Sequence, residues 1–403
     1  MRFPLTGLGV VWLAAMGAVG QSNAPAATQQ EASLAELPHW PVGMKLPASL
    51  TANWKPARRA DALKAEVLVW TPPQARRIRA VVLIPNNTDS KHFGEHAALR
   101  EVAARRELGV VYLRRFDGSV VERSDPPTHA DQLQAALDAV AEKTGIVEFR
   151  HAPWITFGKS SRGRFPFRTA WQFPQRVIAS ISYHGETPTW PAADWARLRD
   201  ETVLHVNVNG ETEWMGTWYR HVRPCLLNYR ARRAWLPHQV VVHRVGHGNY
   251  ADMHGSEGWG KPVPAGAISC LRVWDYLALY VDKAIQLRVP EKAYPTDGPV
   301  QLTQVDPASG YLVHPRAVEE LLGAKWRPIR EADGVYQIVD HVKEPGEVYD
   351  EDPGEVDRKR LIRKATDVPE AERRKMFWVA DREQAAAWLK LHNVRNVELD
   401  LAK

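Results

Sequence analysis

One short stretch of the chain places a hydroxyl group where protein structure can make it a nucleophile. Trp154–Phe157 (WITF) is an apolar run typical of a short buried strand, and Gly158 and Lys159 follow it directly. The next segment, Ser160–Trp171, is expected to form a helix. A serine on a tight turn between a strand and a helix projects its hydroxyl from the sheet edge, and the next backbone N–H can stabilise an oxyanion. The pattern therefore predicts a nucleophile at Ser160.

The spacing of the glycines around Ser160 determines how closely the strand and the helix can approach each other. Gly158 stands two residues before the serine, whereas Arg162 stands two residues after it and the next glycine is Gly163. Ser161 is an alternative nucleophile, because Ser161-x-Gly163 satisfies the second half of the Gly-x-Ser-x-Gly pattern. The alternative without catalysis is a turn in which Ser160 only caps the following helix.

This turn resembles the Gly-His-Ser-x-Gly-Gly elbows of many esterases of the α/β-hydrolase superfamily, with Lys159 and Arg162 as departures. The sequence Ser182–Gly185 (SYHG) also resembles the segment after the elbow helix in dienelactone-hydrolase-like esterases. The resemblance covers about residues 65–290. It implies a catalytic triad whose members follow one another in the order serine, acid, histidine.

The resemblance places the catalytic base on a loop after the last core strand, which here is Gln239–His243. That loop contains Gly246–Tyr250 (GHGNY), so His247 is the expected base and His254 is the alternative further along. Imidazole titrates near neutral pH and can take the serine proton and return it to a leaving group. The spacing of His243, His247 and His254 fits no zinc signature, so no metal or other cofactor is expected.

In the same resemblance, the acid that orients the histidine follows the strand Val203–Val208. The turn there reads Asn209–Trp214 (NGETEW), and the carboxylate three residues past its glycine is Glu213. Glu211 in this turn and Glu186 after the preceding strand remain alternatives. A carboxylate at any of these positions would accept the Nδ1 proton of the base and hold its tautomer.

Groups near the serine indicate how a substrate would be held. The backbone N–H of Ser161 is one expected oxyanion donor, and Asn86 or Asn87, after the strand Ala80–Pro85, would supply the other.

Lys159 and Arg162 flank the serine and could pair with a carboxylate on the substrate. The chain contains 16 tryptophans, whose faces stack on sugar and aromatic rings. Six of them lie near these motifs in the sequence: Trp154, Trp190, Trp195, Trp214, Trp218 and Trp259. Together these residues suggest a small-molecule or carbohydrate ester as substrate.

Strands that are apolar on both faces alternate with segments of helical periodicity. The expected strands are Ala65–Thr71, Ala80–Pro85, Gly109–Leu113, Trp154–Phe157, Val177–Ser182, Val203–Val208 and Gln239–His243. The expected helices are His129–Lys143, Ser160–Trp171 and Ala265–Leu287. This pattern indicates a parallel sheet covered on both faces. The predicted fold is a three-layer α/β/α sandwich with a mostly parallel central sheet, the α/β-hydrolase fold, over residues 46–293.

The remaining segments suggest an exported protein. Residues 1–20 carry Arg2, the mostly apolar stretch Leu5–Val19 and small residues before Gln21, as a secretory signal peptide does. Residues 21–45, rich in Ala, Gln, Ser and Pro, are expected to form a flexible leader. No further segment is apolar enough to span a membrane, so we expect a secreted or periplasmic protein without a span after cleavage.

The last segment, residues 294–403, is expected to be a C-terminal appendage without an assigned fold. Its recognisable elements are the strand-like Gly310–Val313 and Val335–Val339 and an amphipathic helix at Asp381–Leu391. Cys225 and Cys270 are the only cysteines, and both a disulfide and burial as separate thiols are open to them.

The balance of charge excludes one class of partner. The net charge is +6, and the basic residues alternate with acidic ones without forming a long run. Nucleic acid is therefore not an expected partner. The functional hypotheses are an esterase acting through an acyl-enzyme, a peptidase of the same fold, and a non-catalytic binding protein on a hydrolase scaffold.

Overall fold

The computed structural model describes residues 40–46, 66–73, 75–85, 87, 90–114, 127–185, 201–213, 217–232, 235–247, 266–323, 330–331, 334–335, 357–399 and 401. The proposed signal peptide and all of the leader before residue 40 lie outside these residues. So do four candidates for the site: Asn86, Glu186, Trp214 and His254.

The core of the protein is one eight-stranded sheet with the strand order β1-β2-β4-β3-β5-β6-β7-β8. Its strands are β1 (Val42–Lys45), β2 (Glu66–Trp70), β3 (Ala80–Pro85), β4 (Leu108–Arg114), β5 (Trp154–Lys159), β6 (Val177–Tyr183), β7 (Leu204–Gly210) and β8 (Leu236–Val242). The pairs β1–β2 and β2–β4 are antiparallel, and every other neighbouring pair is parallel. β3 and β5 to β8 are buried along their whole length, as parallel strands covered on both faces must be.

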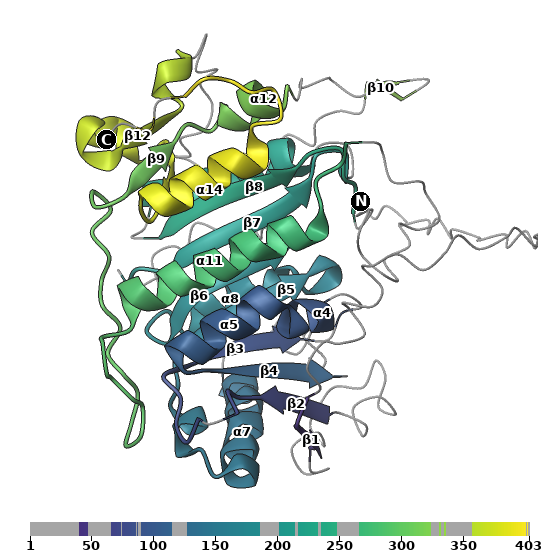
Figure 1. Cartoon of the computed structure of the whole chain (residues 1–403), viewed down its shortest axis with the longest axis vertical. Coiled ribbons are helices and arrows are strands. Elements are labelled where there is room, and N and C mark those ends of the chain that lie inside the picture. The colour runs from purple at the N-terminus through teal and green to yellow at the C-terminus, as the bar shows by residue number, and fades with distance from the viewer. Residues whose placement is uncertain are drawn as a thin grey trace, which may run out of the picture. The chain divides into compact units, whose positions relative to one another are not determined.

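Helices cover both faces of this sheet. They are α4 (Ser90–Glu95), α5 (Ala97–Arg106), α7 (Pro127–Thr144), α8 (Arg164–Gln172), α10 (Arg223–Arg232) and α11 (Cys270–Arg288). Figure 1 shows α5 and α11 packed against each other on the near face, with α8 behind β5 and β6. The predicted three-layer, mostly parallel fold is confirmed. The sheet begins before residue 46, because β1 pairs with β2.

The described part of the C-terminal appendage packs against the edge of the sheet. Its larger elements are β9 (Tyr311–Val313), α12 (Ala317–Leu322), β12 (Ile362–Lys364), β13 (Phe377–Val379) and α14 (Arg382–His392), and β9 lies between β12 and β13. The smaller ones are β10 (Arg330–Glu331), β11 (Gly334–Val335) and α13 (Glu370–Arg373).

α14 covers the hydrogen-bonding groups of β8, the last strand of the sheet. Trp388 Nε1 donates to the Gln239 carbonyl at 2.8 Å, and the Val241 N–H donates to His392 Nε2 at 3.0 Å. These bonds pair backbone groups that an edge strand would otherwise leave open. The appendage thus completes the eight-stranded core at this edge.

The two cysteines lie at helices and are both buried. Cys225 is in α10 and Cys270 begins α11, and neither forms a disulfide. Within the described segments, the helices fall short of the length and apolar character that crossing a membrane requires.

Candidate active site

The serine turn is a strained junction between β5 and α8. Ser160 begins a short 3-10 turn, Ser160–Arg162, directly after β5 ends at Lys159. Its φ angle is +53°, in the left-handed region that non-glycine residues rarely adopt. Such a conformation costs on the order of 1–3 kcal/mol and persists only where the surrounding structure imposes it.

Two glycines allow the strand and the helix to meet around this serine. A Cβ atom on Gly158 would lie 2.1 Å from the Arg162 carbonyl oxygen. A Cβ atom on Gly163 would lie 2.3 Å from Cα of Gly185, in the turn that follows β6. The close approach therefore falls three residues after Ser160 and not two, which explains why Arg162 is compatible with the turn.

Three predicted side chains form one hydrogen-bonded chain. Ser160 Oγ lies 2.6 Å from His247 Nε2. His247 Nδ1 in turn hydrogen-bonds to Oε1 of Glu213. The histidine comes from the loop after β8 and the glutamate from the turn after β7, so the carboxyl ends of three parallel strands bring the groups together.

The Glu213 carboxylate is buried and surrounded by donors. The Gly210 N–H donates to Oε2 at 2.9 Å, Asn209 Nδ2 donates at 3.2 Å and His184 Nδ1 lies 2.9 Å away. Burial by itself would raise the pKa of Glu213, but electrostatic attraction to His184 and His247 and the hydrogen bonds from both rings outweigh burial and hold this pKa below its usual range. The carboxylate is therefore ionised at neutral pH. Its charge favours the tautomer of His247 with the proton on Nδ1, which leaves Nε2 to accept from Ser160.

Backbone contacts join the acid turn to the histidine loop. The Glu211 N–H donates to the Val242 carbonyl and the Thr212 N–H donates to the Val245 carbonyl, each at 3.0 Å. A Cβ atom on Gly210 would lie 2.2 Å from the Val245 carbonyl oxygen, so the turn requires a glycine there. Together these backbone contacts fix the position of the Glu213 carboxylate relative to the His247 imidazole.

The alternative acid in the same turn has other partners. Glu211 Oε2 lies 2.7 Å from His243 Nδ1 and accepts from the Arg244 N–H at 2.8 Å. The structure therefore brings Glu213, and not Glu211, to His247. Ser161, the alternative nucleophile, is exposed on the turn, whereas the imidazole bonds to Ser160.

Of the other predicted binding residues, Asn87 bonds to the serine turn, Lys159 is buried and Arg162 is partly exposed. The Asn87 side chain donates to the Lys159 carbonyl at 2.7 Å and so ties the loop after β3 to the serine turn. Lys159 itself is only 4% exposed, with its ammonium 6.0 Å from the ring centroid of Tyr183. Burial lowers its pKa to about 8, although the charges of Cys270 and Glu213 act to raise it. Its charge is enclosed by the protein, whereas Arg162 is partly exposed.

Two of the six tryptophans near the motifs belong to the core. Trp154 in β5 is 1% exposed and Trp218 is 4% exposed, so neither offers a face to a substrate. The other four, Trp190, Trp195, Trp214 and Trp259, lie outside the described residues.

His184 lies within the motif Ser182–Gly185, but the sequence analysis gave it no role at the site. It follows β6 directly, is fully buried and contacts the Glu213 carboxylate. The available signal was its position, because a polar residue at the carboxyl end of a parallel strand lies beside the residues that end the neighbouring strands.

Among the described residues, one group of side chains has the composition of a metal site, and it includes His184 in place of Ser160. Donor atoms of His184, Glu213 and His247 lie within 4.8 Å of one another. Both Nδ1 atoms, however, are engaged in hydrogen bonds to the carboxylate. The arrangement thus fits a proton-transfer chain better than a cation site.

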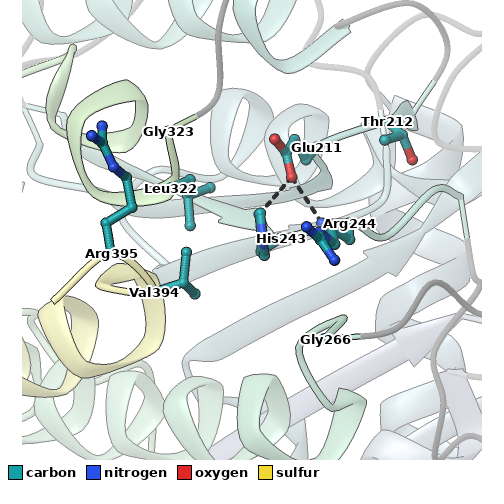
Figure 2. A pocket seen from close by; sticks show the side chains of 9 residues that line it. All are labelled: Glu211, Thr212, His243, Arg244, Gly266, Leu322, Gly323, Val394 and Arg395. Carbon is teal, nitrogen blue, oxygen red and sulfur yellow. Dashed lines mark hydrogen bonds and ion pairs between the residues drawn. The ribbon is translucent and has the colours of Figure 1, made fainter.

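A cavity of about 620 Å³ lies beside the acid turn, between the end of β8 and the appendage. It is lined by Glu211, Thr212, His243, Arg244, Gly266, Leu322, Gly323, Val394 and Arg395. Figure 2 shows Glu211 paired with His243 and with the backbone N–H of Arg244, with Arg395 on the other side of the cavity. The lining includes neither Ser160 nor His247, so this cavity is separate from the hydrogen-bonded chain.

Comparisons with known proteins find similarity only among solved structures. No protein-family model and no curated protein matches the chain. Est1E from Butyrivibrio proteoclasticus is 9% identical, with 56% of this chain and 96% of that chain covered and a TM-score of 0.34. The siderophore hydrolase EstA from Aspergillus nidulans is 11% identical, with 54% and 89% covered and a TM-score of 0.35. The dienelactone hydrolase-like promiscuous phosphotriesterase P91 from metagenomic libraries is 14% identical, with 54% and 88% covered and a TM-score of 0.36.

The class of fold follows from the sheet and the serine turn. A mostly parallel eight-stranded sheet between helical layers, with a positive-φ serine between β5 and α8, is the α/β-hydrolase fold.

Proposed function

We propose that this protein is a serine hydrolase that cleaves carboxylic esters through an acyl-enzyme. The observation that carries the proposal is the 2.6 Å contact between Ser160 Oγ and His247 Nε2 on a strained turn. A serine that only capped α8 would need no histidine at this distance and no left-handed backbone. The buried, ionised Glu213 behind the imidazole completes the set of groups that ester hydrolysis requires.

The reaction begins with attack of Ser160 Oγ on the ester carbonyl carbon. As the C–O bond forms, His247 Nε2 takes the hydroxyl proton and Glu213 stabilises the resulting imidazolium. The oxyanion is bound by the Ser161 N–H at the start of the helical turn and by a second N–H from the loop after β3. When the tetrahedral intermediate collapses, the bond to the alcohol breaks and His247 gives that alcohol its proton.

Deacylation repeats these steps with water. The imidazole takes a proton from a water molecule, which attacks the acyl carbon, and it returns the proton to Ser160 Oγ as the carboxylic acid leaves. Glu213 stays ionised throughout, because its role is to orient the imidazole and to balance its charge.

We propose a carbohydrate or aryl ester as the substrate. The support is local in sequence, since Trp214 directly follows Glu213, and Trp190, Trp195 and Trp259 lie in the same region of the chain. Indole rings favour flat sugar and aromatic groups. Comparison of acetylated sugars, phenyl esters and straight-chain alkyl esters by kcat/KM tests this class.

The test of the reaction is turnover of p-nitrophenyl acetate together with labelling by a fluorophosphonate. We expect one covalent label per chain at Ser160, and loss of both label and turnover in Ser160→Ala. The matched control is Ser161→Ala, the adjacent hydroxyl, which should keep both. A folded wild-type protein that takes no label and turns over no ester would instead support a binding protein on a hydrolase scaffold. Preferential cleavage of a peptide p-nitroanilide would favour the peptidase alternative.

We also propose that the enzyme is exported. The proposal depends on Arg2 and the apolar stretch Leu5–Val19 before Gln21. Amino-terminal sequencing of the protein recovered from the periplasm or medium of an expressing bacterium should begin near Gln21. Recovery of the full chain from the cytoplasm alone would contradict export.

A further inference from the structure

A second histidine contacts the carboxylate of the hydrogen-bonded chain, on the side away from the serine. His184 Nδ1 lies 2.9 Å from Glu213 Oε2, while His247 Nδ1 bonds to Oε1. Both His184 and the Glu213 side chain are completely buried. The two imidazole rings are nearly perpendicular, at 86°, with centroids 5.9 Å apart. One carboxylate is therefore hydrogen-bonded to two imidazoles, and the imidazole that contacts Ser160 is that of His247.

The protonation state of His184 follows from its surroundings. Burial lowers the pKa of His184, although Glu213 acts to raise it, so the ring is neutral at pH 7. The neighbouring carboxylate is ionised, so the single ring proton lies on Nδ1 and is donated to Oε2. Other titratable groups that interact electrostatically with this cluster are Lys159 at the end of β5 and, next to it, Cys270 at the start of α11.

This hydrogen bond determines how the carboxylate is oriented. Oε2 receives His184 Nδ1, Asn209 Nδ2 and the Gly210 N–H, three donors that together occupy this oxygen. Oε1 is thereby left to His247. Of the three donors on Oε2, only His184 comes from outside the acid turn, so it alone ties the carboxylate to β6.

The backbone of His184 is held as firmly as its side chain. Its φ angle is +50°, and its N–H donates to the Val208 carbonyl at 2.7 Å. The next residue, Gly185, is in the close backbone contact with Gly163 of the serine turn. His184 therefore links the end of β6 to both the acid turn and the serine turn, and a strained conformation at such a place indicates a constraint imposed by the site.

We propose that His184 is a positioning residue, which holds Glu213 with Oε1 toward His247 and withdraws part of the carboxylate's charge from that imidazole. The proposal rests on the proposed ester hydrolysis. Without the His184 donor, the Glu213 carboxylate can rotate. Its negative charge is then less neutralised by hydrogen bonding and attracts the His247 imidazolium more strongly. The base is then less well aligned and more readily protonated.

The kinetic test compares His184→Leu with His184→Asn, whose side-chain N–H takes the place of Nδ1–H. We expect His184→Leu to lower kcat on the order of 10- to 100-fold through misalignment. KM should change little, because the buried imidazole does not meet the substrate. The acid limb of the kcat/KM profile should move to higher pH, and His184→Asn should restore most of kcat and the original limb.

The matched control is His205→Leu, another completely buried histidine, on β7, whose described ring contacts are aromatic: Phe167, Tyr229 and Trp235. This variant loses a comparable buried ring without a bond to Glu213. It should lower the unfolding temperature and leave the pH profile in place. An equal shift of the acid limb in both variants, or unchanged kcat and profile in His184→Leu, would overturn the proposal.

A measurement on the wild-type protein covers the case in which His184→Leu does not fold. Proton NMR with 15N-labelled histidine should show two strongly downfield Nδ1–H resonances, one from each imidazole on Glu213. A His184 ring that carries its proton on Nε2 instead would refute the proposal. This readout needs no turnover, so it separates failure of the positioning role from failure of the esterase function, which the Ser160 label tests.

Discussion

Replacing Glu213 with glutamine would remove the charge behind the base while changing the side-chain volume very little. The carboxylate accepts from four groups, namely His247, His184, Asn209 and the Gly210 N–H. A glutamine offers one oxygen and one NH₂ group, and that NH₂ must face at least one donor. If it faces His247, the imidazole turns to the tautomer with its proton on Nε2, which can no longer accept from Ser160.

The expected magnitude follows from this change of tautomer. A triad carboxylate replaced by its amide in serine proteases costs about 10⁴-fold in kcat. A 10⁴-fold loss corresponds to roughly 5 kcal/mol of transition-state stabilisation. Stability should fall as well, by about 1–3 kcal/mol for each buried donor left without an acceptor. The activity loss should therefore exceed any effect of partial unfolding at 25 °C.

The assay is steady-state hydrolysis of p-nitrophenyl acetate, with the rate of fluorophosphonate labelling as an independent measure of acylation. Glu211→Gln is the matched control, because this carboxylate lies in the same turn but bonds to His243 and Arg244. It should keep kcat within a few-fold of the wild type. Activity in Glu213→Gln above about a tenth of the wild type, or a larger loss in Glu211→Gln, would refute the assignment of the acid.

Two further predictions concern stability. Burial lowers the pKa of His205 and His238 to about 3 and that of His392 to about 4. In the unfolded chain these histidines have the ordinary pKa of about 6.5, so between about pH 6.5 and pH 4 the unfolded chain binds more protons than the folded protein. The unfolding temperature should therefore fall as the pH is lowered from about 6.5 to about 4, and it should fall less steeply in His205→Phe. An unfolding temperature that stays constant over this range would contradict the prediction. Gly163→Ala would place a Cβ atom 2.3 Å from Cα of Gly185, in the turn after β6. We expect this variant to lose about 1–3 kcal/mol of unfolding free energy, measured by denaturant unfolding, and to lose esterase activity. Gly298→Ala, whose Cβ atom would lie in open space, should change neither.

Local sequence patterns were sufficient for the strands β2 to β8 and for the serine turn. The apolar run Ala80–Pro85 predicted β3 with the bounds that it has, and the predicted helix at Asp381–Leu391 became α14 with Asp381 as its N-cap. Such elements depend on short-range periodicity and capping, which a single segment contains. α5 (Ala97–Arg106) was not predicted, because its alanines and charged residues show little apolar periodicity.

Local sequence patterns could not predict which distant segments pair with each other. Nothing within Val42–Lys45 indicates that it adds an antiparallel strand to β2, and nothing in the sequence of the appendage indicates that Trp388 and His392 bond to the edge of β8. These contacts join residues far apart in the chain, so their free energy arises only when the fold brings both partners together.

The sequence by itself determined the fold class, because apolar strands and helical periodicity are properties of short segments. The predicted order of serine, acid and histidine came from the resemblance of the serine turn to esterase elbows. Only the tertiary structure decided between Glu213 and Glu211, since the two carboxylates differ by two positions in one turn and their partners lie on other strands. It also decided that the close backbone contact falls at Gly163 and that His184 joins the carboxylate. Each of these outcomes depends on distances between neighbouring strand ends, which the register of the sheet sets.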